Sequence, residues 1–435
     1  MHRFPTRLTV LQVACFAALV GLGISVPVWA DEPAGAKSAA ADWPQFLGPD
    51  RNGVSRETGL LTEWPDGGPK QVWRVAGGQG MSGLAISDGR LLTLVQKSGR
   101  QWAICLDAKT GQKNWERDLA PAYRNKMGDG PRATPAIAGG TAFVFTGEGI
   151  LAALNMADGK ILWQKDAVAE FGGEIAEYGM ACSPLVAGEN VVVVVGAPEA
   201  TVAAFNRNTG AVAWKAGKDD PAGYSSPAIM KLNGRDHLVV FHGAGAMGVD
   251  PARGNLFWHY PYVTDFNCNI ATPVAAGGGV LLSSGENHGS VLLKITSNPA
   301  ERLMQSTPAW ESLGPSSVLR NEWQTSILLD GYLYGIDNVG GAGPVSHLTC
   351  VEAATGKRQW QQVRFGKGNP IAADGKLFVP TIDGNLVVVK ANPQKYDELG
   401  RAAVAGKIRQ APALAGGLLY LRDEREIVCL DMRKP

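Results

Sequence analysis

Polar and aromatic side chains recur just before a series of short apolar segments, and these residues are the best suited to binding chemistry. They are Arg132, Glu177, Tyr178, Tyr224, Asn267, Asn269, Glu322, Trp323, Asn369 and Arg409. If they surround one opening, Trp323 would supply an aromatic floor. Glu322, Asn269 and Asn369 would then supply oxygen ligands suited to a hard cation such as Ca²⁺. The simpler interpretation is that these polar residues only solvate the mouth of a channel, so no metal site and no catalytic residue is assigned.

Familiar cofactor and catalytic patterns are absent or lie in the wrong context. Gly243–Gly248 matches the Gly-x-Gly-x-x-Gly string of dinucleotide-binding sites, but we expect it in a turn between two strands, with no helix to follow. None of the histidines after the expected signal peptide has the spacing of a zinc site. They are His237, His242, His259, His288 and His347. No phosphate-binding loop or Gly-x-Ser-x-Gly nucleophile elbow is present.

The cysteines do not form an obvious disulfide framework, because an odd number remains after Cys15 is set aside. Cys105, Cys350 and Cys429 each lie two residues before a recurrent acidic position, where other repeats have Ala. They are therefore expected to be small, inert core residues. Cys182 and Cys268 lie elsewhere in the repeat, and we would test only those two for reactivity.

The N-terminus has the parts of a secretory signal peptide. A basic start is followed by the apolar stretch Leu8–Val26 and by Val28-Trp29-Ala30, which resembles a cleavage site. The apolar stretch is also close to the roughly 17–20 residues of a membrane anchor. Pro27 and the cleavage-like triplet favour a signal peptide over residues 1–30, cleaved after Ala30.

The composition excludes some partners. The chain has 41 Lys and Arg against 40 Asp and Glu, and loss of Arg3 and Arg7 with the signal leaves a net charge of about −1. No strong field attracts nucleic acid or an anionic membrane. The 55 glycines, 12 tryptophans and 19% charged residues fit many short strands joined by tight turns. Residues 31–41 are small and polar, typical of a flexible tether.

An internal repeat organises the rest of the chain. An Asp, Asn or Glu is followed after three residues by Gly and after three more by Trp. The copies are Asp107–Gly111–Trp115, Asn155–Gly159–Trp163, Asn206–Gly210–Trp214, Asp250–Gly254–Trp258 and Glu352–Gly356–Trp360. Trp73 and Trp310 occupy the final position of two degraded copies. This regular recurrence predicts a repeat architecture.

A second motif precedes the first in each unit. A small residue and Pro lead into a short Gly-containing turn and then an apolar run. The copies are Thr134-Pro135, Ser183-Pro184, Ser226-Pro227, Thr272-Pro273, Asn369-Pro370 and Ala411-Pro412, while Gly83-Leu84 and Thr325-Ser326 lack the Pro. Pro is tolerated at the first residue of a strand, and Gly-containing dipeptides supply tight hairpins. These motifs predict eight inner hairpins, each followed by two further strands of one four-stranded blade.

The recurrent tryptophans are expected to be structural. Each large ring can bury about 150–250 Å², and recurrence at one place in the blade favours packing over ligand binding. We assign this structural role to Trp73, Trp115, Trp163, Trp214, Trp258, Trp310 and Trp360. The last repeat ends at Asp431 without a Trp, so Gly68–Val75 is expected to supply its outer strand and close the ring. The fold predicted is an all-β, eight-bladed propeller with four-stranded antiparallel blades, closed by N- and C-terminal strands.

The Asp/Asn-x3-Gly-x3-Trp copies resemble the tryptophan-docking repeats of pyrroloquinoline-quinone (PQQ) type propellers. That family includes quinoprotein alcohol dehydrogenases and the propeller lipoprotein of the outer-membrane barrel-assembly machinery. The segment Trp43–Ser55 is similar to the start of exported PQQ-like repeat proteins that are abundant in Planctomycetes. The resemblance spans residues 42–433. It implies a lead-in over residues 42–67 and a propeller over residues 68–435.

The resemblance also implies what a quinoprotein would need. Quinoprotein dehydrogenases hold PQQ with Ca²⁺ in the central funnel, beneath a disulfide between adjacent cysteines, and this chain has no adjacent cysteine pair and no Cys-x-x-Cys-His haem motif. The first hypothesis is therefore a non-catalytic binding or scaffold module of the cell envelope. The alternative is a PQQ- and Ca²⁺-dependent oxidoreductase acting on an alcohol or sugar, and a hydrolase on the same fold is a weaker third.

The expected partners follow from these hypotheses. They are an envelope protein or a small-molecule ligand, without nucleic acid. After signal cleavage we expect no transmembrane span, a periplasmic or secreted location and a monomer.

Overall fold

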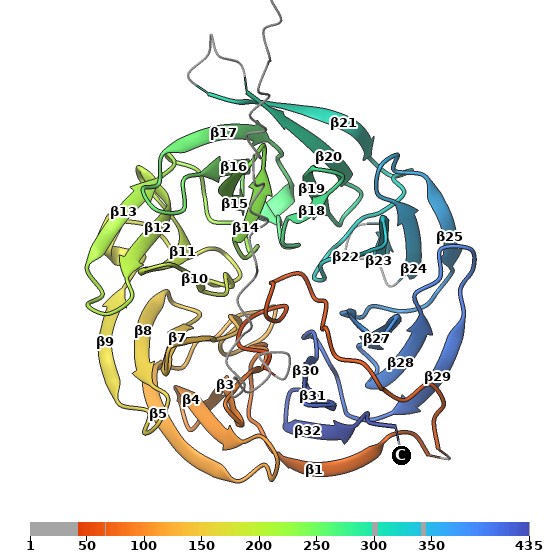
Figure 1. Ribbon diagram of the computed structural model, residues 1–435. Coiled ribbons are helices and arrows are strands. Elements are labelled where there is room, and N and C mark those ends of the chain that lie inside the picture. The colour runs from red at the N-terminus through yellow and green to blue at the C-terminus, as the bar shows by residue number, and fades with distance from the viewer. Residues whose placement is uncertain (1–41, 66, 298–302, 341–344, 435) are drawn as a thin grey trace, which may run out of the picture. The chain divides into compact units, whose positions relative to one another are not determined.

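The chain folds into eight four-stranded antiparallel sheets that follow one another around a ring, as the computed structural model in Figure 1 shows. The structure describes residues 42–65, 67–297, 303–340 and 345–434, so the expected signal peptide and tether lie outside the described residues. The predicted all-β, eight-bladed propeller is confirmed. Among the described residues there is no helix long and apolar enough to cross a membrane.

Each blade is a meander from an inner to an outer strand. Blade 1 is β2 (Ala85–Ser87), β3 (Arg90–Lys97), β4 (Arg100–Asp107) and β5 (Lys113–Pro121). Blade 2 is β6 (Ala136–Ala138), β7 (Thr141–Phe145), β8 (Ile150–Asn155) and β9 (Ile161–Asp166). Blade 3 is β10 (Leu185–Ala187), β11 (Asn190–Ala197), β12 (Ala200–Asn206) and β13 (Val212–Ala216). Blade 4 is β14 (Ala228–Leu232), β15 (Arg235–His242), β16 (Gly245–Val249) and β17 (Leu256–Pro261).

The second half of the ring repeats this order. Blade 5 is β18 (Val274–Ala276), β19 (Gly279–Ser284), β20 (Gly289–Thr296) and β21 (Gln305–Leu313). Blade 6 is β22 (Ile327–Leu329), β23 (Tyr332–Val339), β24 (Val345–Glu352) and β25 (Arg358–Gln362). Blade 7 is β26 (Ile371–Ala373), β27 (Lys376–Pro380), β28 (Asn385–Lys390) and β29 (Glu398–Ala403). Blade 8 is β30 (Ala413–Ala415), β31 (Leu418–Arg422), β32 (Glu426–Asp431) and β1 (Lys70–Ala76). Two short 3₁₀ turns, η2 (Ala169–Phe171) and η3 (Asp265–Asn267), lie in loops.

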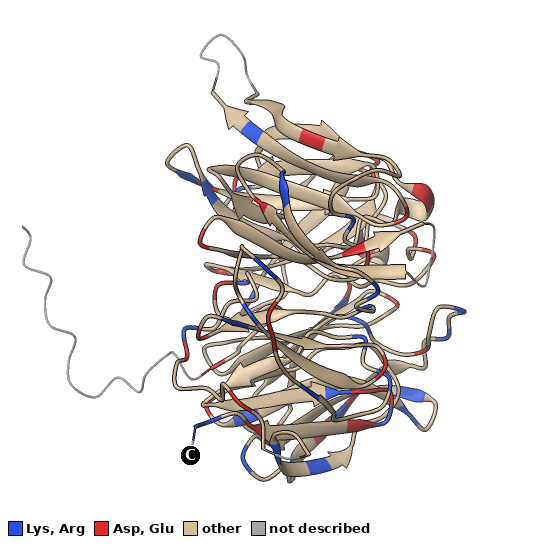
Figure 2. Cartoon of the chain, turned by 90° about the vertical axis from the view of Figure 1, so that its right-hand side faces the viewer, with Lys and Arg blue, Asp and Glu red and all other residues tan. Residues whose placement is uncertain are grey.

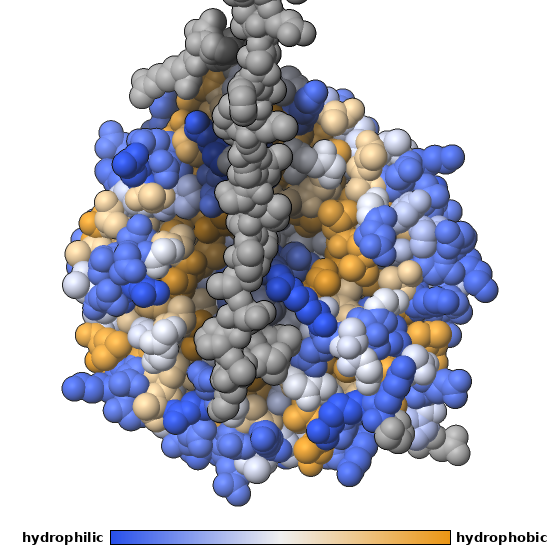
Figure 3. Space-filling model, viewed as in Figure 1, coloured by the Kyte–Doolittle hydropathy of each residue, from blue (hydrophilic) through white to orange (hydrophobic). Residues whose placement is uncertain are grey.

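Burial changes from the middle to the edge of a blade. The middle strands are apolar runs buried on both faces by neighbouring sheets, as in β7 and β11. The outer strands alternate, and β9 shows half-buried and exposed residues in turn. Figure 3 shows apolar residues gathered toward the middle of the visible face and hydrophilic residues around its edge. Figure 2 shows both signs of charge interspersed over one side.

The Asp/Asn-x3-Gly spacing is explained by the turn between the third and fourth strands. The Asp107 carboxylate accepts hydrogen bonds from the backbone N–H groups of Lys109 and Thr110, at 3.0 and 2.8 Å. Gly111 then adopts φ +72°, a left-handed conformation that disfavours other residues. A Cβ atom on Gly111 would also lie 2.8 Å from the ring of Trp73 in the preceding blade. The glycine is therefore required by both its backbone conformation and its close neighbour.

The recurrent tryptophans lie between blades. The Trp115 indole N–H donates to the Met156 carbonyl of the next blade at 3.0 Å, and Trp163 donates to Arg207 in the same way at 2.9 Å. Trp73, Trp310 and Trp360 also donate to backbone carbonyls of the following blade. In their outer strands, Trp115 and Trp163 are each the third residue and directly follow a bulge, whereas Trp310 is the sixth residue of β21.

The joint after blade 4 departs from this pattern. Trp258 is fully buried, and its indole donates to Nδ1 of His237 in its own blade at 3.0 Å. Gly248, also in blade 4, faces the same ring. Trp310 continues the usual pattern one blade later. The Trp214 indole, by contrast, has no hydrogen-bond partner among the described residues.

The ring is closed by strands from both ends of the chain. β1 pairs antiparallel with β32, so the predicted N-terminal outer strand of the last sheet is confirmed. Across the seam, the buried Arg422 of blade 8 donates to the carbonyls of Ser82, Gly78 and Leu94. Burial lowers its pKa to about 10. Figure 1 shows β1 beside β32, the first and last strands of the ring.

The lead-in, residues 42–67, crosses the face of the propeller that carries the turns between the first and second strands of the blades. Asp42 accepts from Ser87 in such a turn, and Glu57 accepts from the backbone N–H of Gly416 in another. Arg51 is buried at the centre and donates to the carbonyls of Ser183 and Pro227, at 2.6 and 2.7 Å. The segment therefore covers one mouth of the central channel.

Candidate functional site

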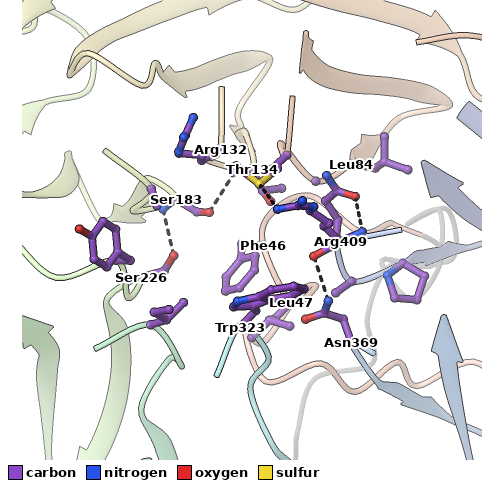
Figure 4. A pocket seen from close by; sticks show the side chains of 18 of the residues that line it. Phe46, Leu47, Leu84, Arg132, Thr134, Ser183, Ser226, Trp323, Asn369 and Arg409 are labelled. Carbon is purple, nitrogen blue, oxygen red and sulfur yellow. Dashed lines mark hydrogen bonds between the residues drawn. The ribbon is translucent and has the colours of Figure 1, made fainter. Parts of the chain in front are cut away.

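The central channel contains a cavity of about 210 Å³ between the lead-in and the first strands of the blades. Its lining residues are Trp43, Phe46, Leu47, Met81, Gly83, Leu84, Met127, Arg132, Thr134, Tyr178, Ala181, Ser183, Tyr224, Ser226, Ile270, Trp323, Asn369, Arg409, Gln410, Ala411 and Pro412. Most come from the segments that enter an inner strand, whereas the first three come from the lead-in. Figure 4 shows Phe46 and Leu47 inside the ring of blade residues.

The cavity brings together part of the set expected from the sequence. The expected residues that line it are Arg132, Tyr178, Tyr224, Trp323, Asn369 and Arg409. They come from blades far apart in sequence because every inner strand starts at the same end of the channel. Glu177, Asn267, Asn269 and Glu322 do not line it.

The expected oxygen ligands are engaged elsewhere. The Asn269 amide is fully buried and donates to the carbonyls of His242 and Tyr262, at 2.7 and 3.0 Å. Glu322 forms an ion pair with Lys367 at 2.6 Å. Glu177 is exposed and paired with Lys126, while Asn267 is exposed in η3. These groups therefore do not converge on one point with Asn369.

Arg132 and Arg409 are held by one loop between β5 and β6. Arg132 donates to the Gly128 carbonyl at 2.7 Å, and Arg409 donates to the adjacent Met127 carbonyl at 3.1 Å. Burial lowers the pKa of Arg132. Arg409 Nε also lies 3.5 Å from a carboxylate oxygen of Glu424, yet it is buried without a hydrogen-bond partner among the described residues.

Aromatic rings form two parts of the wall. Tyr178 and Tyr224 stack with ring centroids 5.7 Å apart, and Tyr178 also contacts the ring of Phe266 at 6.4 Å. Burial raises the pKa of the Tyr224 hydroxyl, so it stays neutral near pH 7. Trp323 lies under the Lys367 ammonium at 4.5 Å and the Arg409 guanidinium at 5.6 Å, which is cation–π geometry.

Several hydroxyl groups at the starts of the inner strands have a structural function. The backbone N–H of Thr134 donates to the Ser183 hydroxyl at 3.0 Å, and the N–H of Ser183 donates to the Ser226 hydroxyl at 2.9 Å. Thr272 N–H donates to the Thr325 hydroxyl in the same way. These bonds, partly visible in Figure 4, run around the channel from blade to blade. The hydroxyl groups therefore join the blades, and none has a general base beside it in the cavity.

The lead-in residues Trp43, Phe46 and Leu47 were not identified from the sequence as part of a site. The segment was assigned only as a lead-in, because no local pattern says where a nonrepeating segment packs. The one available signal was its richness in aromatic residues outside the blades, since large apolar side chains are usually covered. Met81 and Met127 were missed for a similar reason.

The donor set does not fit PQQ with Ca²⁺. The cavity lining contains no Asp, Glu, His or Cys, whereas Ca²⁺ is held mainly by carboxylate and carbonyl oxygens. Among the described residues, no group of three or more His, Cys, Asp or Glu side chains could hold a metal ion.

The expectations for the cysteines and for the glycine-rich string are only partly confirmed. Cys105, Cys350 and Cys429 are buried core residues, as predicted. Cys182 was a candidate for reactivity, but it is also buried, and desolvation raises its pKa to about 11, so little thiolate forms. Cys268 is half-buried, and burial with nearby carboxylates raises its pKa to about 12. Within Gly243–Gly248, the first two residues form the predicted turn between β15 and β16, the other four begin β16, and no helix follows.

A second cavity lies at the outer part of blades 3 and 4, with a volume of about 910 Å³. Its lining includes Asp220, His242 and His259. His242 Nδ1 is 4.0 Å from an Asp220 oxygen, and burial lowers the His242 pKa. This spacing is too long for a hydrogen-bonded acid–base pair.

Comparison with known proteins agrees with this architecture. Residues 99–342 and 344–433 match the family described as outer membrane protein assembly factor BamB. A relative of that name from Shewanella oneidensis is 33% identical over 113 residues, which is 25% of this chain and 26% of the relative. The curated relative is thus matched over about a quarter of its length.

Similar solved structures include two kinds of propeller. Quinohemoprotein alcohol dehydrogenase from Comamonas testosteroni has a TM-score of 0.64 at 14% identity, covering 91% of this chain and 81% of that one. BamB from Moraxella catarrhalis has a TM-score of 0.58 at 15% identity, covering 83% and 99%. Identities this low show the shared fold alone. With the family match extending over most of the sequence, the chain belongs to the family of BamB-like proteins with PQQ-like propeller repeats.

Proposed function

We propose that this protein is a non-catalytic binding module of the cell envelope that takes its ligand in the central channel. The observation that carries the proposal is the lining of the cavity, which combines apolar and aromatic walls with two arginines and has no Asp, Glu, His or Cys. Such a lining can hold a molecule, but it offers no acid–base pair and no activated nucleophile.

The covered mouth supports the same function. The lead-in fills one end of the channel and is held there by Arg51, whose guanidinium donates to several backbone carbonyls. A ligand would therefore enter from the mouth where the loops before the inner strands lie. A cavity closed at one end suits retention of a ligand more than passage through the ring.

The cell-envelope location rests on two supports. The related protein from Shewanella oneidensis is named an outer membrane protein assembly factor, and the N-terminal sequence has the order of parts expected of a signal peptide. Export into the periplasm or beyond would be tested by sequencing the N-terminus of the mature protein, where we expect Asp31.

The deciding experiment compares binding with turnover. The mature protein is supplied with PQQ, millimolar Ca²⁺, alcohols or sugars and an artificial dye. We expect no dye reduction and no saturable tryptophan quenching by PQQ. Dye reduction together with quenching that Trp323→Ala removes would overturn the proposal in favour of a quinone-dependent oxidoreductase.

Binding itself is tested by thermal shift with a chemically varied set of small molecules. A bound ligand raises the melting temperature in a concentration-dependent way. We expect Trp323→Ala to abolish the shift and Trp102→Ala to preserve it, because Trp102 lies in β4 and does not line the cavity. Shifts that survive Trp323→Ala unchanged would place binding elsewhere.

A further inference from the structure

One hydroxyl group in the wall of the central cavity lacks a hydrogen-bond partner among the residues that the structure describes. It belongs to Thr134, which is 5% exposed and lines the cavity. The backbone N–H of Thr134 donates to the Ser183 hydroxyl at 3.0 Å, so the position of the residue is fixed without its side chain. A hydroxyl group has one proton to donate. Because this one faces a cavity, it can donate that proton to a molecule in the cavity.

Thr272 holds the equivalent position before the inner strand of blade 5. Its backbone N–H donates to the Thr325 hydroxyl at 3.0 Å, as the N–H of Thr134 does to Ser183. The side-chain oxygen of Thr272 also has no hydrogen-bond partner among the described residues, but it is fully buried. Thr272 is not part of the cavity lining. The two threonines therefore differ in whether a ligand can reach the hydroxyl group.

The lead-in brings an aromatic ring to the same part of the wall. Arg51 donates to the carbonyl of Ser183, the residue whose hydroxyl accepts from Thr134. The Arg51 guanidinium lies 5.8 Å from the centre of the Phe46 ring. Figure 4 shows Phe46 in the middle of the labelled residues, with Ser183 and Thr134 to one side of it and Trp323 to another. A molecule in the cavity therefore meets aromatic surface near the Thr134 hydroxyl.

The two arginines of the lining are engaged by the protein itself. Arg132 donates to carbonyl groups of the loop before β6 and lies 4.6 Å from the centre of the Tyr123 ring. Arg409 donates to the Met127 carbonyl and lies 3.5 Å from a carboxylate oxygen of Glu424. The lining contains no Asp or Glu that could attract a cation. An ion would therefore give up its hydration in the cavity without gaining a free counter-charge, which favours an uncharged occupant.

We propose that the channel binds a small uncharged molecule whose apolar body packs beside Phe46 and Trp323 and whose oxygen atom accepts a hydrogen bond from the Thr134 hydroxyl. This inference rests on the proposed binding function and names its ligand class. Apolar cavities of about 150 Å³ bind benzene. A cavity of about 210 Å³ therefore suits a single aromatic ring with a short ketone, ester or alcohol substituent.

The test uses four probes that share one planar shape. Acetophenone, α-methylstyrene, benzoate and benzamidine carry a neutral oxygen acceptor, no acceptor, an anion and a cation on the same phenyl ring. Each is titrated into the mature protein by isothermal titration calorimetry. We expect saturable binding of acetophenone and of α-methylstyrene, and no detectable binding of the two ions at the same concentrations. Benzoate or benzamidine binding as tightly as acetophenone would overturn the proposal, while the channel would remain a binding site.

Two variants then locate the oxygen atom of the ligand. Thr134→Val keeps the shape of the side chain and removes its hydroxyl. It should weaken acetophenone binding by about three- to tenfold, the usual effect of one neutral hydrogen bond, and leave α-methylstyrene binding unchanged. Thr272→Val is the matched control, because it makes the same change at a position outside the cavity lining, and it should affect neither probe. Circular dichroism and thermal melting establish that both variants are folded.

The outcomes separate this inference from the proposed function. If Thr134→Val weakens both neutral probes equally, or neither of them, the hydrogen bond assigned to Thr134 is wrong. If none of the four probes binds, the ligand class is wrong, and the thermal-shift and dye-reduction experiments still decide between binding and turnover. Dye reduction with PQQ would overturn the proposed function whatever the four probes do.

Discussion

The outer joints between blades and the central channel use similar residue types for different purposes. At the joints, one arrangement recurs, in which an indole from one blade contacts a glycine and a carbonyl of the next. In the channel, Trp323 and Trp43 each occur once and line a cavity. A tryptophan that repeats has its partner specified by the repeat, whereas a single tryptophan has its partner specified only by the folded ring.

The comparison also separates two kinds of arginine. Arg422 is buried at the seam between blades 8 and 1 and donates to four acceptors. The Nε atoms of Arg422 and of Arg409 in the channel are both buried without a hydrogen-bond partner among the described residues. The two arginines differ in position: Arg422 joins two blades, whereas Arg409 also lines the central cavity. The predictions below test the outer joints between blades and the floor of the channel.

The largest expected effect is at an outer joint. Gly159→Ala places a Cβ 2.4 Å from the Trp115 ring at φ +71°, whereas Gly139→Ala meets no atom within 4 Å at φ +57°. Both lose about 1–2 kcal/mol from the left-handed backbone, and Gly159→Ala should lose about 1–3 kcal/mol more from overpacking. Urea unfolding measures both. Equal losses would show that the Trp115 contact is not tight.

Arg51→Met tests the floor of the channel. It removes the hydrogen bonds to the carbonyls of Ser183, Pro184 and Pro227, and the free energy of unfolding should fall by about 2–4 kcal/mol. Arg56→Met, in the same segment, removes only an exposed ion pair with Asp50 and should change stability by less than about 1 kcal/mol. If both variants behave alike in urea unfolding, the lead-in is not anchored by Arg51.

The contact between Trp258 and His237 in blade 4 should make the free energy of unfolding depend on pH. His237 must keep Nδ1 unprotonated to accept from Trp258, and burial lowers its pKa from 6.5 to about 4. Because the unfolded chain binds this proton more readily, stability is present above pH 6.5 and is lost as the pH falls toward 4. The loss should be about 2–3 kcal/mol. In His237→Gln, the pH dependence of urea unfolding should be smaller over that range; an unchanged profile would exclude His237 as its source.

The smallest expected effect is the difference in stability loss between substitutions of two tryptophans at the outer joints. The Trp163 indole donates to Arg207 at 2.9 Å, while the buried Trp214 indole has no hydrogen-bond partner among the described residues. Trp163→Phe should therefore cost about 1 kcal/mol more than Trp214→Phe. The difference in thermal melting temperature between the two variants checks this. A larger loss for Trp214→Phe would mean that packing area, not hydrogen bonding, separates the joints.

The sequence predicted the blades well because each blade is a local object. Asp107–Gly111–Trp115 specifies a turn, a left-handed glycine and a packing ring within nine residues, and the same information recurs along the chain. The site was predicted in part for the same reason, since Arg132, Asn369 and Arg409 precede inner strands and so had to face the channel. Asn269 also precedes one, but its amide bonds to His242 and Tyr262, which no local pattern indicates.

By itself, the sequence determined the fold, the number of blades and the strand that closes the ring, because periodic glycine, proline and tryptophan specify turns and packing over short distances. Only the tertiary structure decided that the lead-in covers one mouth of the channel and supplies Phe46 and Leu47 to the cavity. It also decided that Arg132 and Arg409 share one loop. These contacts join segments hundreds of residues apart that occur once each, so their partners are fixed by the geometry of the closed ring and not by any repeat.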